Sequence, residues 1–147
     1  MSFFNSINIA ATGLTAQRVR MDTIAENIAN VNTTRTADGG PFQRRTVIFE
    51  ERAGRDPFNA IFGDHMNRQG QGVRVTQIIS DPTPGMLTFD PHHPDADEFG
   101  YVRMPNINIV EEMVNMISAS RSYEANITAM TSFRTIVSRT LEIGSGR

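Results

Sequence analysis

Apolar residues recur along the first thirty positions with the spacing of an amphipathic helix. One series repeats every seven residues, and a second interleaves with it at alternating steps of four and three. The first comprises Phe3, Ala10, Gln17, Ile24 and Val31, and the second comprises Ile7, Leu14, Met21 and Ile28. This a/d heptad seam predicts a helix over residues 3–31, roughly 40 Å long at about 1.5 Å per residue, that packs on another helix.

The predicted helix closes with the stretch AENIANVNTT at residues 25–34. Asn and Thr side chains compete for backbone hydrogen bonds and so favour the end of a helix. We therefore expect a turn motif that leads out of the helix, formed by Ala29, Asn30, Asn32 and Thr33.

The other end of the chain carries a matching pattern. Asn108 and Glu111 have the spacing of a capping box, and apolar periodicity follows them. One heptad series comprises Ile109, Met116, Tyr123, Met130 and Val137, and the second comprises Met113, Ser120, Ile127, Arg134 and Leu141. A further stripe widens the apolar face: Val110, Val114, Ile117, Phe133 and Ile136. These patterns predict a second helix over residues 109–142.

The intervening residues 34–105 hold all seven prolines and most of the glycines. Short apolar runs between turn residues predict strands at 46–49, 73–79, 86–89 and 101–104, in a small antiparallel sheet or partial barrel. Residues 50–70 have no clear period and are expected to form a mobile loop. The sequence thus predicts an α+β fold in three segments: 1–33, 34–105 and 106–147.

The apolar surface of the two helical seams is larger than residues 34–105 can cover. We expect the helices to pair with each other in an antiparallel, coiled-coil-like arm. One side of each seam would still face water, so helices of neighbouring subunits are expected to cover it. The predicted assembly seam consists of the apolar members of the four series, Phe3, Ile7, Leu14, Met21, Ile24, Ile28, Val31, Ile109, Met113, Met116, Tyr123, Ile127, Met130, Val137 and Leu141.

Composition narrows the function classes. The net charge is −2 with acidic and basic residues mixed along the chain, which argues against nucleic-acid binding. The absence of Cys excludes disulfides and thiolate chemistry. The N-terminal residues lack a basic region and a continuous apolar core, so we expect no cleavable signal peptide. No run approaches the about 20 apolar residues of a membrane span.

One stretch could bind a metal ion. Residues 90–98 read DPHHPDADE, so Asp90, His92 and His93 could supply ligands to Zn²⁺ or Ni²⁺. Adjacent His side chains on an extended chain point to opposite faces, and a proline-bracketed turn explains the same residues. No serine-nucleophile elbow, phosphate-binding loop or acid/base pair is apparent. The sequence predicts no catalytic residue, no cofactor and no metal site.

At this point the residues resemble a known family. AENIANVNT at the end of a heptad-bearing helix is similar to the signature of flagellar axial proteins, the rod, hook and hook-associated subunits. The runs GVRVTQIISDPTPGMLTFDPHHPDADEFGYVRMPNINIVEEMV and ASRSYEAN, with the ending TLEIGSGR, are similar to its short proximal-rod subunits. The resemblance covers nearly the whole chain; residues 54–68 match no motif of the family.

The resemblance implies a structural subunit and no enzyme. Such proteins are exported through the flagellar type III apparatus and assemble in the periplasm into the rod, which transmits torque from the inner-membrane ring to the distal rod and hook. The implied partners are other copies, other rod proteins, the inner-membrane ring with a rod-base adaptor protein, and the export apparatus. Two alternatives remain: a metal-dependent enzyme using Asp90, His92 and His93, and a coiled-coil adaptor or export chaperone.

Overall fold

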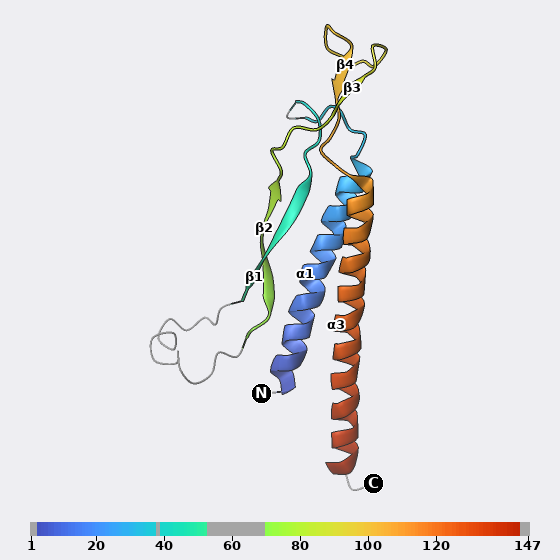
Figure 1. Ribbon diagram of the computed structural model, residues 1–147. Coiled ribbons are helices and arrows are strands. Elements are labelled where there is room, and N and C mark those ends of the chain that lie inside the picture. Colours follow the sequence, from blue (N-terminus) through green and yellow to red (C-terminus); the bar gives the residue numbers. More distant parts are fainter. Residues whose placement is uncertain (1–2, 38, 53–69, 145–147) are drawn as a thin grey trace, which may run out of the picture.

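Two long antiparallel helices form the body of the molecule. The computed structural model describes residues 3–37, 39–52 and 70–144. Helix α1 spans Phe3–Ala29 and helix α3 spans Ile109–Gly144. They run side by side in opposite directions, and α3 continues past the N-terminus of α1 (Figure 1). The predicted α+β fold with paired terminal helices is confirmed.

Local chemistry sets the helix ends. The side chain of Asn108 accepts a hydrogen bond from the backbone N–H of Val110 at 3.0 Å, which satisfies a free donor in the first turn of α3. At the end of α1, the Asn30 amide donates to the backbone oxygen of Glu26 at 3.0 Å. Helix α1 ends two residues before the predicted boundary and α3 ends two residues after it.

The strands form two separate two-stranded ladders. Strand β1 (Arg45–Glu51) pairs antiparallel with β2 (Val73–Ser80), and β3 (Leu87–Phe89) pairs antiparallel with β4 (Tyr101–Arg103). The expectation of one sheet or partial barrel was therefore wrong for the described residues. The expected mobile loop falls mainly on residues 53–69, which lie outside the described part of the chain.

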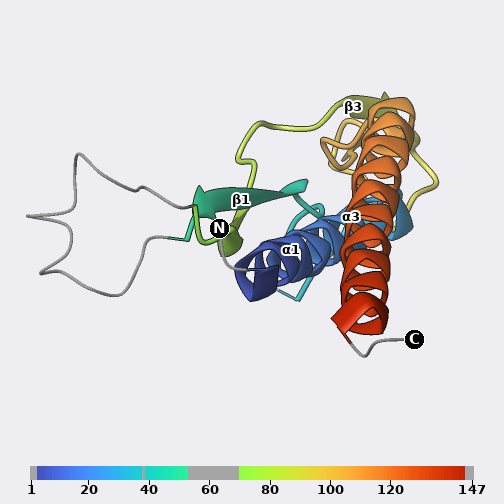
Figure 2. The same ribbon diagram turned by 90° about the horizontal axis from the view of Figure 1, so that it is seen from below.

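The β1–β2 hairpin packs along α1, so α1 lies between this hairpin and α3 (Figures 1 and 2). A bulge between Ile48 and Phe49 shifts the register by one residue. The backbone N–H of Val73 donates to the Thr12 hydroxyl at 3.2 Å, which ties β2 to α1. Gly72 has a φ of 97°, and a Cβ there would overlap the Thr12 hydroxyl oxygen. Only glycine allows this close approach.

The β3–β4 hairpin projects beyond the helix pair (Figure 1). It packs on no other helix or strand that the structure describes. The Phe89 and Tyr101 rings meet edge to face, 5.3 Å apart. Gly100 has a φ of 80° and brings the chain under the Phe89 ring.

The interior is thin for a chain of this length. The buried apolar side chains in the described residues are few and mostly small: Ala10, Ala16, Ile24, Phe42, Val102 and Ala119. Burial of apolar surface is the main stabilising term in folding. A chain with so small a core leaves much of its apolar surface in water.

Candidate assembly interface

The helix–helix contact uses only part of the predicted seam. On α1, Ile24 is buried, whereas Ile7, Leu14, Met21, Ile28 and Val31 are half-buried. The Phe3 side chain lies outside the described residues. On α3, the series Met116, Tyr123, Met130 and Val137 is half-buried. The seam therefore divides into a covered part and an open part.

The most buried positions of the helices are residues that the heptad analysis had placed outside the seam. Ala16, Thr23 and Asn27 are buried on α1, and Glu112 and Ala119 are buried on α3. Gly13 of α1 lies against Asn126 of α3, where an added Cβ would come within 2.9 Å of Asn126 Oδ1. Small and polar residues thus let the two helices approach closely.

Two open members of the seam and three residues of the further stripe form an apolar strip along the first turns of α3. Each lies three or four residues from another member, so the five share one helix face. We call this surface the α3 strip; it comprises Ile109, Val110, Met113, Val114 and Ile117, with exposed fractions of 44, 68, 54, 61 and 53%. This is an exposed face larger than scattered surface residues would give, and such faces mark interaction sites.

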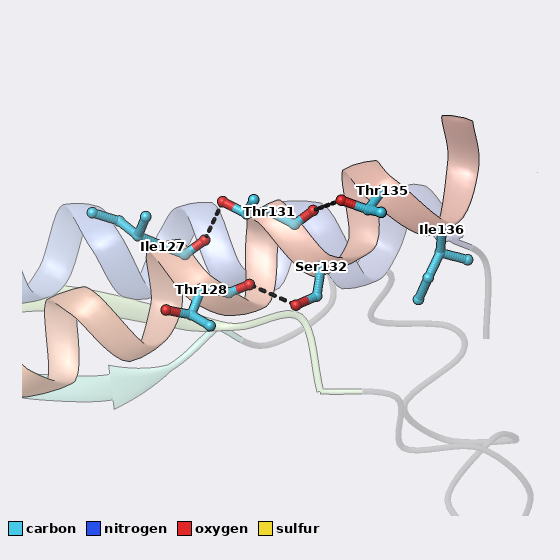
Figure 3. Close-up of a pocket in the computed structure, with 6 residues that line it drawn as sticks. All are labelled: Ile127, Thr128, Thr131, Ser132, Thr135 and Ile136. Carbon is cyan, nitrogen blue, oxygen red and sulfur yellow. Dashed lines mark hydrogen bonds between the residues drawn. The ribbon is translucent and has the colours of Figure 1, made fainter. Parts of the chain in front are cut away.

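A shallow groove of about 450 Å³ lies on the second half of α3 (Figure 3). We call it the α3 groove; it is lined by Ile127, Thr128, Thr131, Ser132, Thr135 and Ile136. Each hydroxyl donates to the backbone oxygen four residues earlier, for example Thr131 to Ile127 at 2.9 Å and Ser132 to Thr128 at 2.9 Å. The donors are used within the helix, so covering the groove would leave none of them unpaired.

The remaining apolar residues of α3 continue the exposed surface to its end. Leu141 is 67% exposed and Ile143 is 82% exposed. Helix α3, with 36 residues against 27 in α1, continues past the N-terminus of α1, so α1 does not cover this last segment (Figure 1).

A buried polar cluster joins the helix pair to the β1–β2 hairpin. We call Asn27, Arg44 and Glu112 the junction. Glu112 is only 1% exposed; its Oε1 accepts hydrogen bonds from Arg44 Nε at 2.8 Å and Nη2 at 2.7 Å, and its Oε2 accepts one from Asn27 Nδ2 at 2.9 Å. Asn27 also exchanges two hydrogen bonds with the Arg45 backbone, both at 2.9 Å. The carboxylate charge is thus paired and hydrogen-bonded on both oxygens.

Backbone contacts extend the junction to the segment before α3. Asn106 Oδ1 accepts from the Arg44 N–H at 2.8 Å, and its amide donates to the Asp81 backbone oxygen at 3.1 Å. Asp81 donates its own N–H to the Arg44 backbone oxygen at 2.8 Å. Hydrogen bonds from the Thr83 hydroxyl and N–H to Oδ1 lower the pKa of the Asp81 carboxyl.

Sequence reasoning missed the junction. The heptad analysis left Asn27 and Glu112 outside the seam, and charged and amide side chains are usually exposed. A usable sign was present: Glu112, Ala119, Asn126 and Phe133 recur at sevens beside the predicted seam, which marks the stripe that faces α1.

The predicted turn motif lies at the exit from α1. Thr33 donates its N–H to the Asn30 backbone oxygen at 3.0 Å and its hydroxyl to Asn30 Oδ1 at 3.1 Å. Ala29 and Asn32 are exposed. The chain then turns back, and the Phe42 N–H donates to the Thr33 oxygen at 3.0 Å.

Residues 90–98, the candidate metal-binding stretch, form turns stabilised by hydrogen bonds to the backbone. Asp90 Oδ1 accepts from the His92 N–H at 3.2 Å, and His93 Nδ1 accepts from the Asp95 N–H at 3.1 Å. Among the described residues, no three or more His, Asp or Glu side chains are grouped to hold a metal ion. His65 lies outside those residues. The Asp90 and His93 side chains thus hydrogen-bond to the backbone of the β3–β4 loop.

Comparison with known proteins identifies the family. Residues 7–35 match the family described as flagella basal body rod protein, and residues 99–143 match the family described as flagellar basal body rod FlgEFG protein C-terminal. A protein of Borreliella burgdorferi named flagellar basal-body rod protein FlgC is 51% identical, with 99% of this chain and 100% of that protein covered. The chain belongs to the FlgC family.

Other FlgC-family proteins agree over the whole length. The FlgC proteins of Aquifex aeolicus and Bacillus subtilis are 42% and 40% identical, and at least 97% of each chain is covered. This chain is accordingly a structural subunit of a flagellar basal-body rod, which assembles with other rod components. Neither helix of the described chain is long and apolar enough to cross a membrane.

Proposed function

We propose that this FlgC-family chain joins the rod through the α3 strip and the open members of the seam, which helices of neighbouring copies and related rod proteins cover. The single observation that carries this proposal is the exposure of five apolar side chains in the first turns of α3. Burying one such side chain contributes about 1.5–3 kcal/mol. A strip shared by several neighbours would therefore hold a subunit firmly although each contact is small.

The same arrangement explains a mechanical role in transmitting torque from the inner-membrane ring to the distal rod and hook. Helices that interdigitate along shared apolar surfaces resist sliding together. The junction fixes the β1–β2 hairpin to the helix pair, so that force on the hairpin reaches the helices. Torque would then pass through the side-chain packing of many subunits rather than through one hinge.

The route to this site is part of the proposal. The chain is exported through the flagellar type III apparatus and assembles in the periplasm, where it meets other rod proteins and a rod-base adaptor. The match of the two terminal segments to flagellar basal-body rod families supports this view. No catalytic role is proposed.

The replacement Val114→Asp tests the strip. Val114 is 61% exposed, so the variant should fold with little loss of stability but place a charge in the shared interface. We expect export to continue, basal bodies to lack a complete rod, and swimming to be lost. Electron microscopy of isolated basal bodies and a motility assay provide the readouts.

The matched control is Ser138→Asp, an exposed position in the same helix. It lies twenty-four residues after Val114, about 36 Å along the helix axis, and is far from the five apolar positions. Normal rods in both variants would refute the role of the strip. Loss of rods in both would show general sensitivity of α3 to charge.

A further inference from the structure

The loop between β3 and β4 carries an exposed aromatic side chain on a rigid, acidic support. We call residues 90–100 the acidic tip. Phe99 is 79% exposed, the most exposed aromatic side chain of the described residues. Four carboxylates, those of Asp90, Asp95, Asp97 and Glu98, stand in this loop, with no Lys or Arg among them.

Hydrogen bonds hold the acidic tip in one conformation. Asp97 Oδ1 accepts from the N–H groups of Phe99 at 2.9 Å and Tyr101 at 2.8 Å. The Gly100 N–H donates to the Asp97 backbone oxygen at 3.0 Å. Asp95 Oδ2 accepts from the Thr34 hydroxyl at 2.8 Å, which ties the tip to the segment after α1. A loop that is already ordered loses little conformational freedom when it binds.

The α3 groove has complementary properties. Its walls are Ile side chains and Thr methyl groups, and its hydroxyl donors are already satisfied within the helix. It therefore suits a dry apolar or aromatic side chain. Arg139 follows the groove on α3 and is exposed, and Arg134, between Ser132 and Thr135, is exposed as well. Arg139 lies four residues after Thr135, on the same helix face.

The two surfaces cannot meet within one molecule. The acidic tip lies beyond the N-terminal end of α3 (Figure 1), whereas the groove begins at Ile127, eighteen residues into that helix. At about 1.5 Å per residue this separates them by about 27 Å along the axis. A contact between unlike surfaces, one in the β3–β4 loop and one on α3, joins molecules head to tail.

We propose that the acidic tip of one copy of this chain docks in the α3 groove of a second copy, with Phe99 in the groove and Glu98 facing Arg139. This contact specifies which molecule lies next to the chain along the rod axis, and it rests on the proposed assembly function. The apolar anchor supplies attraction, and the opposite charges fix the direction and register of the pair.

Photo-cross-linking tests the contact without removing its aromatic anchor. Benzoylphenylalanine is placed at position 99 in a ¹⁵N-labelled full-length chain, which is mixed with unlabelled chain at high concentration and irradiated. Tryptic cleavage after Arg121, Arg134 and Arg139 gives peptides 122–134 and 135–139, which contain the groove. We expect cross-links between copies to fall on these peptides, and the same cross-link to form in isolated basal bodies.

A charge exchange tests the register. Arg139→Glu should reduce the cross-link between copies at least fivefold, and Glu98→Arg added to it should restore most of the yield. Arg18→Glu, which changes an exposed charge on α1, should leave the yield unchanged. Cross-links confined to one copy, to the α3 strip or to other proteins would overturn the proposal, as would equal losses with Arg18→Glu.

The outcome is separable from that of the proposed function. If Val114→Asp abolishes rods but no cross-link reaches the groove, only the tip-to-groove contact is wrong. If the cross-link forms but Val114→Asp builds normal rods, the strip is not the assembly surface and the tip contact stands.

Discussion

At the residue scale, the junction is the most constrained feature of the molecule. Glu112 is almost fully buried and carries a charge, which is tolerable only because Arg44 and Asn27 satisfy both oxygens. The three residues come from the start of α3, the segment before β1 and the end of α1. Their contact therefore fixes three separate parts of the chain relative to one another.

Replacing Glu112 should show how strongly this contact binds them. Glu112→Ala leaves the Arg44 charge without its partner, and we expect the free energy of unfolding to fall by about 3 kcal/mol. The Arg44 side chain is 28% exposed and regains some hydration, which keeps the loss near the lower end of the usual range. Urea unfolding followed by circular dichroism gives the value.

An exposed carboxylate further along the same helix provides the control. Glu124→Ala should change the unfolding free energy by less than about 0.5 kcal/mol. A double-mutant cycle of Asn27→Ala with Glu112→Ala should give a coupling of about 1 kcal/mol or more. Additive losses would mean that Asn27 and Glu112 stabilise the fold independently.

At the scale of elements, much of the fold follows from the sequence and a defined part does not. The helices, and the positions of all four strands, are predictable because their apolar periods are long or their turns are marked by Pro and Gly. The pairing into two ladders is not predictable, because it depends on Asn106, Asp81 and Arg44 meeting across the chain. The face of α3 that meets α1 was also missed, because small and polar residues form it.

The attachment of the β1–β2 hairpin to α1 depends on a glycine. Gly72→Ala should destabilise the chain by more than Gly40→Ala. Both positions have φ above 80°, which costs roughly 1–2 kcal/mol for a residue with a Cβ. Only at Gly72 would the Cβ also overlap Thr12; nothing lies within 4 Å at Gly40. Thermal unfolding of the two variants measures the difference.

Removing the Thr12 hydroxyl should recover part of the stability that Gly72→Ala loses. In a Thr12→Ala background, Gly72→Ala is expected to be less destabilising than in the original chain, because the hydroxyl no longer blocks the new Cβ. An equal loss in both backgrounds would attribute the whole effect to backbone strain.

The unequal lengths of the helices predict uneven order along α3. Asn126 of α3 lies against Gly13 of α1, and beyond the N-terminus of α1 the last turns of α3 have no other described helix beside them (Figure 1). Backbone amides in the last turns should therefore exchange with deuterium faster than those near the junction in the isolated chain. Mass spectrometry of peptic peptides reports the rates; uniform exchange along α3 would contradict this account.

At the scale of the whole molecule, the single chain buries little of its apolar surface. Its buried apolar residues are few, and its largest exposed apolar side chains lie on α3 and the β3–β4 hairpin. A subunit of this kind reaches its full stability only when neighbours cover these surfaces. Membership of the FlgC family explains why apolar surface is exposed on the single chain, since a basal-body rod is assembled from subunits.

Chemical accessibility of the α3 strip in the monomer and in the rod tests this claim most directly. The chain has no Cys, so Val114→Cys introduces a single thiol at the strip. Maleimide labelling should be fast in the isolated chain and at least tenfold slower in intact basal bodies, and it should recover when those basal bodies are denatured. Equal labelling rates in the isolated chain and in the assembled rod would show that no neighbour covers the strip.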